Sequence, residues 1–230
     1  MSAIGPLRVA ISRAALVANA RLAAPDAIAD LRRDAFGHGV ATVAQAVAEA
    51  GVRSAVVDDA GREAAEAAGL QAVDASPSLD SRTLYGLPGG AGAPAMRLSG
   101  SVLSTKRLLA GEGVSYNATH VAERDTRIAL VSGGFGQGVV RALGNRVDVE
   151  LGGRRHPIVG RVAMDVCVVD VGDADAAPGD EVVYFGGTGP LRDGLAAWEE
   201  ATGLTGPELV CALGVRAGSP GLWLSREVVA

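Results

Sequence analysis

The stretch from residue 74 to residue 95 most constrains the fold of this 230-residue chain, because it separates two parts with different hydrophobic periodicities. Proline, glycine and serine are concentrated there, as S-P-S at 76–78 and P-G-G-A-G-A-P at 88–94. Such segments interrupt helices and strands, since proline lacks an amide hydrogen and glycine adopts conformations that other residues avoid. We therefore predict a first domain at 1–88, a linker at 89–95 and a second domain at 96–230.

Before this boundary, short apolar strands alternate with alanine-rich helical stretches. The predicted elements are strands at 28–31, 54–58 and 70–73 and helices at 40–50 and 60–68. Gly51 and Gly69 stand where the two helices should end. This alternation is typical of strand–helix–strand units with a parallel sheet, so the first domain is predicted to be α/β.

After the boundary the periodicity is mostly two, which predicts a β-rich domain. Residues 146–151 and 154–159 flank Gly152 and Gly153, a spacing that favours a tight hairpin. Further strands are predicted at 161–171 and 180–185, and helices at 191–201 and 206–214. Thr205 and Glu208 have the spacing of a capping box at the start of the last helix.

The composition favours a soluble protein, with 48% hydrophobic residues, 20% charged residues and a net charge of −5. The acidic balance and the lack of a basic stripe argue against nucleic acid and anionic membranes as partners. No apolar run reaches the ~18 residues of a membrane span, and the first residues lack a signal-peptide core. We therefore expect a cytoplasmic location.

Few residues are available for chemistry. His38, His120 and His156 lie far apart, and Cys167 and Cys211 form no C-x-x-C pair. This spacing predicts neither a zinc cluster nor a disulfide framework, and we expect no metal. Lys106 is the single lysine, so any lysine chemistry would have to occur there.

Five motifs follow one another along the chain. They are R-R-D-A-F-G-H-G at 32–39, L-Y-G-L at 84–87, G-E-G-V-S-Y at 111–116, G-G-F-G-Q-G at 133–138 and I-V-G-R-V-A-M-D at 158–165, and G-D-E-V at 179–182 adds a sixth. In this order they resemble the motifs of alanine racemases, where the first reads K-A-D-A-Y-G-H-G and the fifth I-V-G-R-V-C-M-D.

The resemblance implies a TIM barrel followed by a β domain, pyridoxal phosphate in the barrel mouth, and a head-to-tail homodimer. In the family a lysine holds the cofactor and acts as one base, and a tyrosine from the partner subunit is the other. Two bases are needed because a proton leaves one face of the α-carbon and another arrives at the opposite face. Tyr116 matches the second base, and Met164 matches the residue whose backbone faces the substrate carboxylate.

The chain departs from the family at the cofactor lysine, whose position is taken by Arg32. An aldimine requires an amine with a neutral form, whereas a guanidinium stays protonated in proteins. Arg33 offers only another arginine, and Lys106 is expected to be a surface charge. We therefore predict no covalently bound cofactor.

The second departure is length, because a TIM barrel takes about 250 residues and only about 95 precede the β domain here. We expect an incomplete (β/α) barrel fragment that passes from its third strand directly to the segment before Tyr85. The cofactor-binding positions are also changed. Phe36 replaces the phosphate tyrosine, Leu79 replaces the arginine at the ring nitrogen, and Ser81 and Arg82 follow it.

Three functions remain open. The first is a structural or regulatory dimer that does not racemise. The second is a residual or hybrid racemase, in which Tyr116 enters the site of a partner such as an intact racemase that supplies the lysine. The third is a small-anion binding module that uses Arg32, Arg33 and Arg82. Packing roles are the simpler interpretation of Tyr116 and Met164, and a helix cap that of His38. We expect a second copy or the β domain to cover the open sheet.

Overall fold

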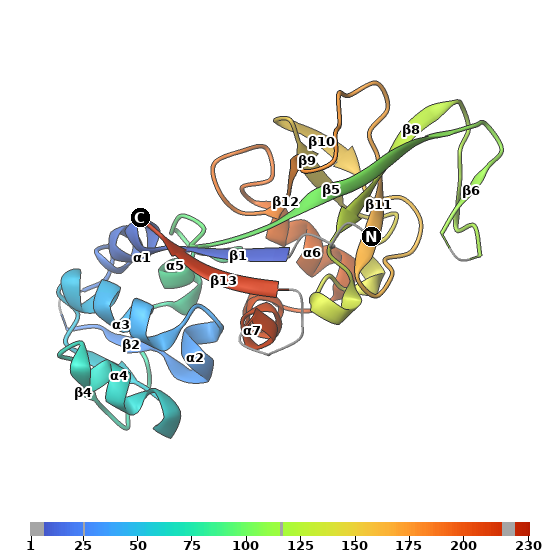
Figure 1. Cartoon of the computed structure of the whole chain (residues 1–230). Helices are drawn as coiled ribbons and strands as arrows, with labels where there is room; N and C mark the ends of the chain where they lie inside the picture. Colours follow the sequence, from blue (N-terminus) through green and yellow to red (C-terminus); the bar gives the residue numbers. More distant parts are fainter. Residues whose placement is uncertain (1–6, 25, 116, 218–223) are drawn as a thin grey trace.

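The computed structural model describes residues 7–24, 26–115, 117–217 and 224–230, and Figure 1 shows a helix-rich part and a sheet-rich part joined by long strands. The helices are α1 (Arg13–Ala20), α2 (Arg32–Phe36), α3 (Val40–Glu49), α4 (Arg62–Ala67), α5 (Ser81–Tyr85), α6 (Gly194–Thr202) and α7 (Gly206–Ala217). Short 3-10 turns are η1 (Asp59–Gly61), η2 (Phe135–Gln137) and η3 (Arg141–Leu143).

The strands form one large sheet and two small ones. They are β1 (Leu7–Ser12), β2 (Ile28–Asp30), β3 (Ser54–Val56), β4 (Gln71–Ala72), β5 (Met96–Leu108), β6 (Gly113–Val114), β7 (His120–Val121), β8 (Thr126–Ser132), β9 (Asp148–Leu151), β10 (Arg154–Pro157), β11 (Val166–Asp170), β12 (Glu181–Phe185) and β13 (Leu224–Val229).

The helix-rich part contains a three-stranded parallel sheet in the order β2–β3–β4, which confirms the three predicted strands. The helices predicted between them are also confirmed, as α3 and as α4 with its preceding turn η1. Ala29, Ala55 and Val47 are fully buried, so small apolar side chains bring α3 close to the strands. Strand and helix alternate here as the periodicity indicated.

The free edge of β2 is covered by the chain itself. The amides of Ser78 and Leu79 both donate to the carbonyl of Ile28 at 3.0 Å, and the Ser78 hydroxyl accepts from the Ile28 amide at 2.9 Å. The Tyr85 hydroxyl donates to the carbonyl of Asp30 at 2.7 Å. These bonds satisfy backbone groups that an exposed strand edge would leave unpaired.

The large sheet has eight strands, with β10–β9–β12–β5–β1–β13 in sequence across it and β8 and β11 attached through β5. The 13-residue strand β5 runs through the sheet-rich part and joins its two halves (Figure 1). β1 pairs with β5 and lies parallel to β13, with Leu7 opposite Leu224. Leu7–Ser12 precedes the predicted boundary in sequence, yet it is hydrogen-bonded in the large sheet.

The predicted hairpin is confirmed as β9 and β10, joined through Gly152 and Gly153 at φ of 57° and 74°. Two positive φ values in a two-residue loop define the turn type whose twist matches the flanking strands. The strand predicted at 161–171 is shorter and starts at Val166, because the preceding residues turn against η2. Thr205 donates to the Glu208 carboxylate at the start of α7, as the capping pattern indicated.

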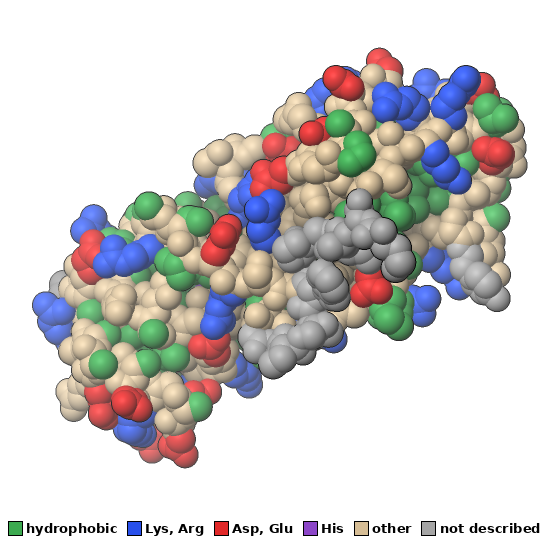
Figure 2. Space-filling view, in the orientation of Figure 1, with side chains coloured by type: hydrophobic (Ala, Val, Ile, Leu, Met, Phe, Trp, Pro, Cys, Tyr) green, Lys and Arg blue, Asp and Glu red, His purple; other side chains and the backbone are tan. Residues whose placement is uncertain are grey.

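Side chains of both halves of the chain share one core. Leu7, Val9 and Ile11 of β1 are fully buried, and an aromatic group of Tyr184, Phe185 and Trp198 fixes α6 on the sheet. On the face shown in Figure 2, positive and negative side chains are interspersed and no basic stripe is present. No helix in the described ranges is long and apolar enough to cross a membrane.

Candidate functional site

The turn that carries Arg32 has a left-handed backbone. Arg33, Asp34, Ala35 and Phe36 have φ between 52° and 56°, and Gly37 follows at 78°. A left-handed turn of non-glycine residues costs roughly 1–2 kcal/mol per residue, so neighbouring groups must hold it. The sequence predicted only a strand end leading into a helix here, because none of these residue types signals such a turn.

Acidic side chains hold this turn in place. Asp34 accepts from the Val40 amide at 2.8 Å and pairs with Arg226 of β13 at 2.6 Å. Arg226 also donates to the carbonyl of Gly37 at 3.1 Å, and the Arg33 amide donates to Asp58 at 2.8 Å. The last strand of the chain thus anchors a turn that lies 192 positions earlier.

Arg32 is bound on two sides to the carboxylate of Asp30. Its Nε donates to Oδ1 at 2.8 Å and its Nη2 to Oδ2 at 2.6 Å. The Asp30 side chain is only 6% exposed, whereas that of Arg32 is 49% exposed. The hydrogen bond that Arg32 donates to Asp30 is the main cause that raises the pKa of Arg32. The guanidinium therefore stays protonated, and its charge is already neutralised.

Three rings pack together behind this pair. The ring of Tyr85 lies 5.1 Å from that of Phe36 and 4.6 Å from that of His38, centroid to centroid. Burial lowers the pKa of His38 to about 4, so the imidazole is neutral near pH 7. Its Nδ1 lies within 3.2 Å of the carbonyls of Ala35 and Phe36. The helix-cap interpretation of His38 is wrong, because the side chain is a core residue and does not cap α3.

Helix α7 lies directly on the turn. A Cβ atom added at Gly37 would come within 2.8 Å of the Cα of Gly214 and of the carbonyl oxygen of Val210. A Cβ added at Gly214 would approach the Gly37 backbone even more closely. Contacts this short exist only between two glycines, so backbone packs on backbone and leaves no space at this face of the turn.

Ser81 and Arg82 form the start of helix α5, which Asp80 caps. Asp80 accepts from the amides of Arg82 and Thr83, and the Thr83 hydroxyl bond is the main cause that lowers the pKa of Asp80. The Arg82 guanidinium donates to the carbonyl of Pro88 at 2.8 Å. The Arg82 side chain is therefore hydrogen-bonded to the glycine-rich loop at residues 88–94.

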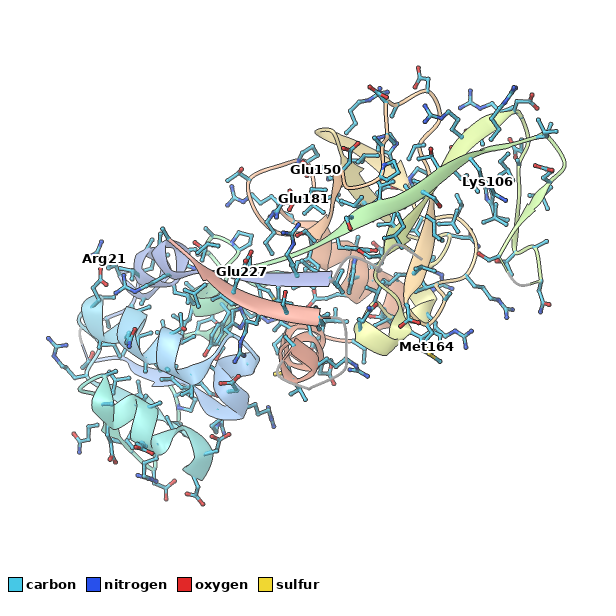
Figure 3. The ribbon with its side chains drawn as sticks, viewed as in Figure 1. Arg21, Lys106, Glu150, Met164, Glu181 and Glu227 are labelled. Atoms are coloured by element: carbon cyan, nitrogen blue, oxygen red, sulfur yellow. The ribbon has the colours of Figure 1, made fainter. Side chains whose placement is uncertain are left out.

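The remaining predicted residues lie in the sheet-rich part. The Met164 side chain is 59% exposed beside η2, so its interpretation as a core residue is wrong. Lys106 is exposed on β5 opposite Ile128, and Figure 3 shows it at the end of that strand away from the helix-rich part. The expected surface charge is confirmed. Tyr116 lies outside the residues that the structure describes.

Arg32 and Phe36 thus lie on the same turn. Ser81, Arg82 and Met164 lie in other elements, and no hydrogen bond or ion pair of the described residues joins their side chains to that turn. Sequence reasoning missed Asp30, Arg226 and Gly214. Asp30 stands two positions before Arg32 at the end of β2, and this spacing could have indicated the ion pair. The other two contact the turn across long sequence separations, for which the sequence carries no local signal.

Comparison with known proteins places these observations in a family. The family model for the alanine racemase C-terminal domain matches residues 95–219. The chain belongs to the alanine racemase family. An alanine racemase from Thermobifida fusca is 42% identical over 123 residues, which are 54% of this chain and 33% of that relative. An alanine racemase from Mycobacterium leprae is 41% identical over 122 residues, 52% of this chain and 31% of the relative. The chain matches about a third of the length of these relatives.

Solved alanine racemase structures share the fold. The enzyme from Streptomyces lavendulae superposes with a TM-score of 0.81 at 19% identity, covering 100% of this chain and 98% of that one. The Bartonella henselae racemase, with covalently bound pyridoxal phosphate, has a TM-score of 0.72 at 18% identity and covers 98% of this chain and 100% of its own. At these identities the likeness concerns the fold alone.

The residues of this chain do not fit covalent pyridoxal phosphate at the family's position. The group there is the permanently charged guanidinium of Arg32, bound by Asp30. Phe36, which the sequence resemblance aligns with the phosphate tyrosine, carries no hydroxyl, and its ring packs on Tyr85 in the core. The single lysine of the sequence lies on β5.

Proposed function

We propose that this chain is a non-racemising alanine racemase homologue that acts as a structural or regulatory dimer in the cytoplasm. The bidentate pair of Arg32 with Asp30 is the observation that supports this most directly. Formation of a Schiff base would require an uncharged amine where a cation is already held by a buried carboxylate.

The packing around the turn supports the same proposal. Racemisation requires a pocket that admits both a cofactor and a substrate, and it requires acids and bases on two faces of the substrate carbon. Here α7 lies against the Gly37 backbone, and Phe36 and His38 are buried against Tyr85. These side chains stabilise a packed core.

We further propose that β2, β3 and β4 with their helices are an incomplete barrel, shortened inside the chain. The three strands are parallel and adjacent in sequence order, as consecutive barrel strands are. The next segment, Ser78 and Leu79, closes onto β2 through the Ile28 carbonyl. The covalent route from the third strand to α5 therefore takes the place of further barrel strands.

The small-anion alternative has less support. Arg32 is paired with Asp30, and Arg82 donates to the carbonyl of Pro88. These two arginines already have partners that an anion would have to displace. The hybrid racemase depends on Tyr116, which lies outside the described residues, and among the residues that the structure does describe no contact favours it.

The test is a racemisation assay on the purified chain with added pyridoxal phosphate, followed by the visible absorption of the mixture. We expect no interconversion of alanine enantiomers and no aldimine band. The Arg32→Lys variant is the informative companion, because it restores the amine alone. We expect it to remain inactive, since the phosphate and ring-nitrogen positions are Phe36 and Leu79. Turnover by the unaltered chain would overturn the proposal. Sedimentation at micromolar concentration tests the dimer, and a strictly monomeric chain would contradict it.

A further inference from the structure

A cavity of about 230 Å³ lies where the helix-rich and sheet-rich parts meet. Tyr85 and Val210, which also contact the Arg32 turn, contribute to its lining, whereas Arg32 itself does not. The glycine-rich loop after α5 forms one wall, and residues of β5, β12, α6 and α7 form the others. Junctions between structural units are a preferred location for small-molecule sites. We propose that this cavity binds a small zwitterion with a compact apolar body, of the kind that a free branched-chain amino acid represents.

The interior of the cavity is apolar. Met96, Phe185, Leu195 and Val210 line it and are all buried. Protein interiors are close-packed, and voids larger than a water molecule are few. A dry apolar cavity of about 150 Å³ is large enough for benzene. The volume here therefore accommodates an aliphatic or aromatic group of about six carbons.

Two opposite charges stand at the rim. Arg192 and Asp193 both line the cavity, and the Nε of Arg192 lies 3.9 Å from Oδ1 of Asp193. Apart from this 3.9 Å contact with each other, neither side chain has a hydrogen-bond partner within the described part of the chain. Asp193 precedes α6 without capping it. Both groups are therefore available to a ligand at the mouth of an apolar pocket.

The charge pattern selects among ligand classes. A ligand with only a carboxylate would be attracted by Arg192 but repelled by Asp193. A ligand with only an ammonium group would be attracted by Asp193 but repelled by Arg192. A zwitterion satisfies both, with its carboxylate on the guanidinium and its ammonium on the aspartate. The adjacent charges of an amino acid match two rim charges on neighbouring residues. This site needs no cofactor and goes beyond the proposed function.

The test uses the full chain and isothermal titration with L-leucine. Two comparison ligands each lack one charge, namely 4-methylpentanoate and 3-methylbutylamine. We expect saturable leucine binding, with both comparison ligands weaker by roughly tenfold or more, because each leaves one rim charge unpaired. This arm needs no altered protein, so misfolding cannot obscure it.

Variants locate the site. Arg192→Gln and Asp193→Asn should each weaken leucine binding by roughly tenfold or more. Ala196→Trp, which places an indole at the mouth, should abolish it. Arg62→Gln on α4 is the matched control, because it removes an exposed arginine far from the cavity and should bind as the unaltered chain does. Absence of saturable leucine binding at millimolar concentration would overturn the proposal, as would binding that all three rim variants retain. Either result would overturn only the binding proposal, because the racemisation assay tests the proposed function separately.

Discussion

Gly214→Ala tests whether α7 lies on the Arg32 turn as the structure has it. In an unconstrained helix this change stabilises by about 1 kcal/mol, since alanine is the better helix former. Here the new Cβ would meet the Gly37 backbone, and the reciprocal Cβ at Gly37 would lie only 2.8 Å from the Gly214 Cα. Overpacking costs about 1–3 kcal/mol, and rigid backbone on the opposite side places this case at the upper end. We expect a net loss of about 2 kcal/mol.

Urea unfolding followed by circular dichroism measures this change, with the thermal midpoint as a second readout. For a chain of this size, a loss of about 2 kcal/mol corresponds to a midpoint lower by roughly 4–8 °C. Glu66→Ala is the control, because it alters an exposed position on a different helix, α4, and it should change stability by less than about 0.5 kcal/mol. A stabilised Gly214→Ala protein would refute the packing of α7 on α2.

Three further changes probe the same region. Arg32→Gln should lower the unfolding free energy by about 2 kcal/mol in urea titrations, because it leaves the buried Asp30 carboxylate without its charged partner; an unchanged midpoint would mean that the pair does not form. His38 should make stability depend on pH, because its pKa falls from 6.5 to about 4 on folding. The unfolded chain then binds the proton first, so stability should fall by up to about 3 kcal/mol as pH drops from about 6.5 to 4. His38→Gln should flatten this part of the profile, and a profile identical to that of the unaltered chain would contradict the assignment. Asp80→Ala should cost about 1 kcal/mol by removing the cap of α5, whereas Asp26→Asn, at an exposed position, should leave the midpoint unchanged.

Local patterns in the sequence were sufficient for the elements whose contacts are local. Strands β2, β3 and β4 form within the predicted ranges 28–31, 54–58 and 70–73, with helices between them, because the apolar spacing there agrees with the burial. Gly152 and Gly153 fixed the hairpin for the same reason, since the turn depends on two adjacent residues.

Contacts between distant segments could not be predicted in this way. β1 lies beside β13, with Leu7 opposite Leu224, and periodicity cannot specify a partner so far along the chain. The left-handed turn at 33–36 is held by Asp58 and Arg226, which come from other elements. Its residues have no intrinsic preference for that backbone.

The candidate site shows the same division. The motif order located Arg32, Phe36, Ser81, Arg82 and Met164 in the chain, and the chemistry of a guanidinium indicated what Arg32 cannot do. The sequence did not show that Asp30 binds Arg32 or that Met164 is exposed. Those facts depend on the tertiary environment of each side chain.

We propose that Arg32, at the position aligned with the family's cofactor lysine, forms no covalent bond with pyridoxal phosphate. The most direct measurement uses the Lys106→Arg variant, which removes the single lysine of the sequence. The protein is incubated with pyridoxal phosphate, reduced with borohydride and mapped by peptide mass spectrometry. We predict no reduced cofactor on any peptide that contains residues 28–40. Reduced cofactor on such a peptide would show that this region does bind the cofactor covalently and would contradict the proposal.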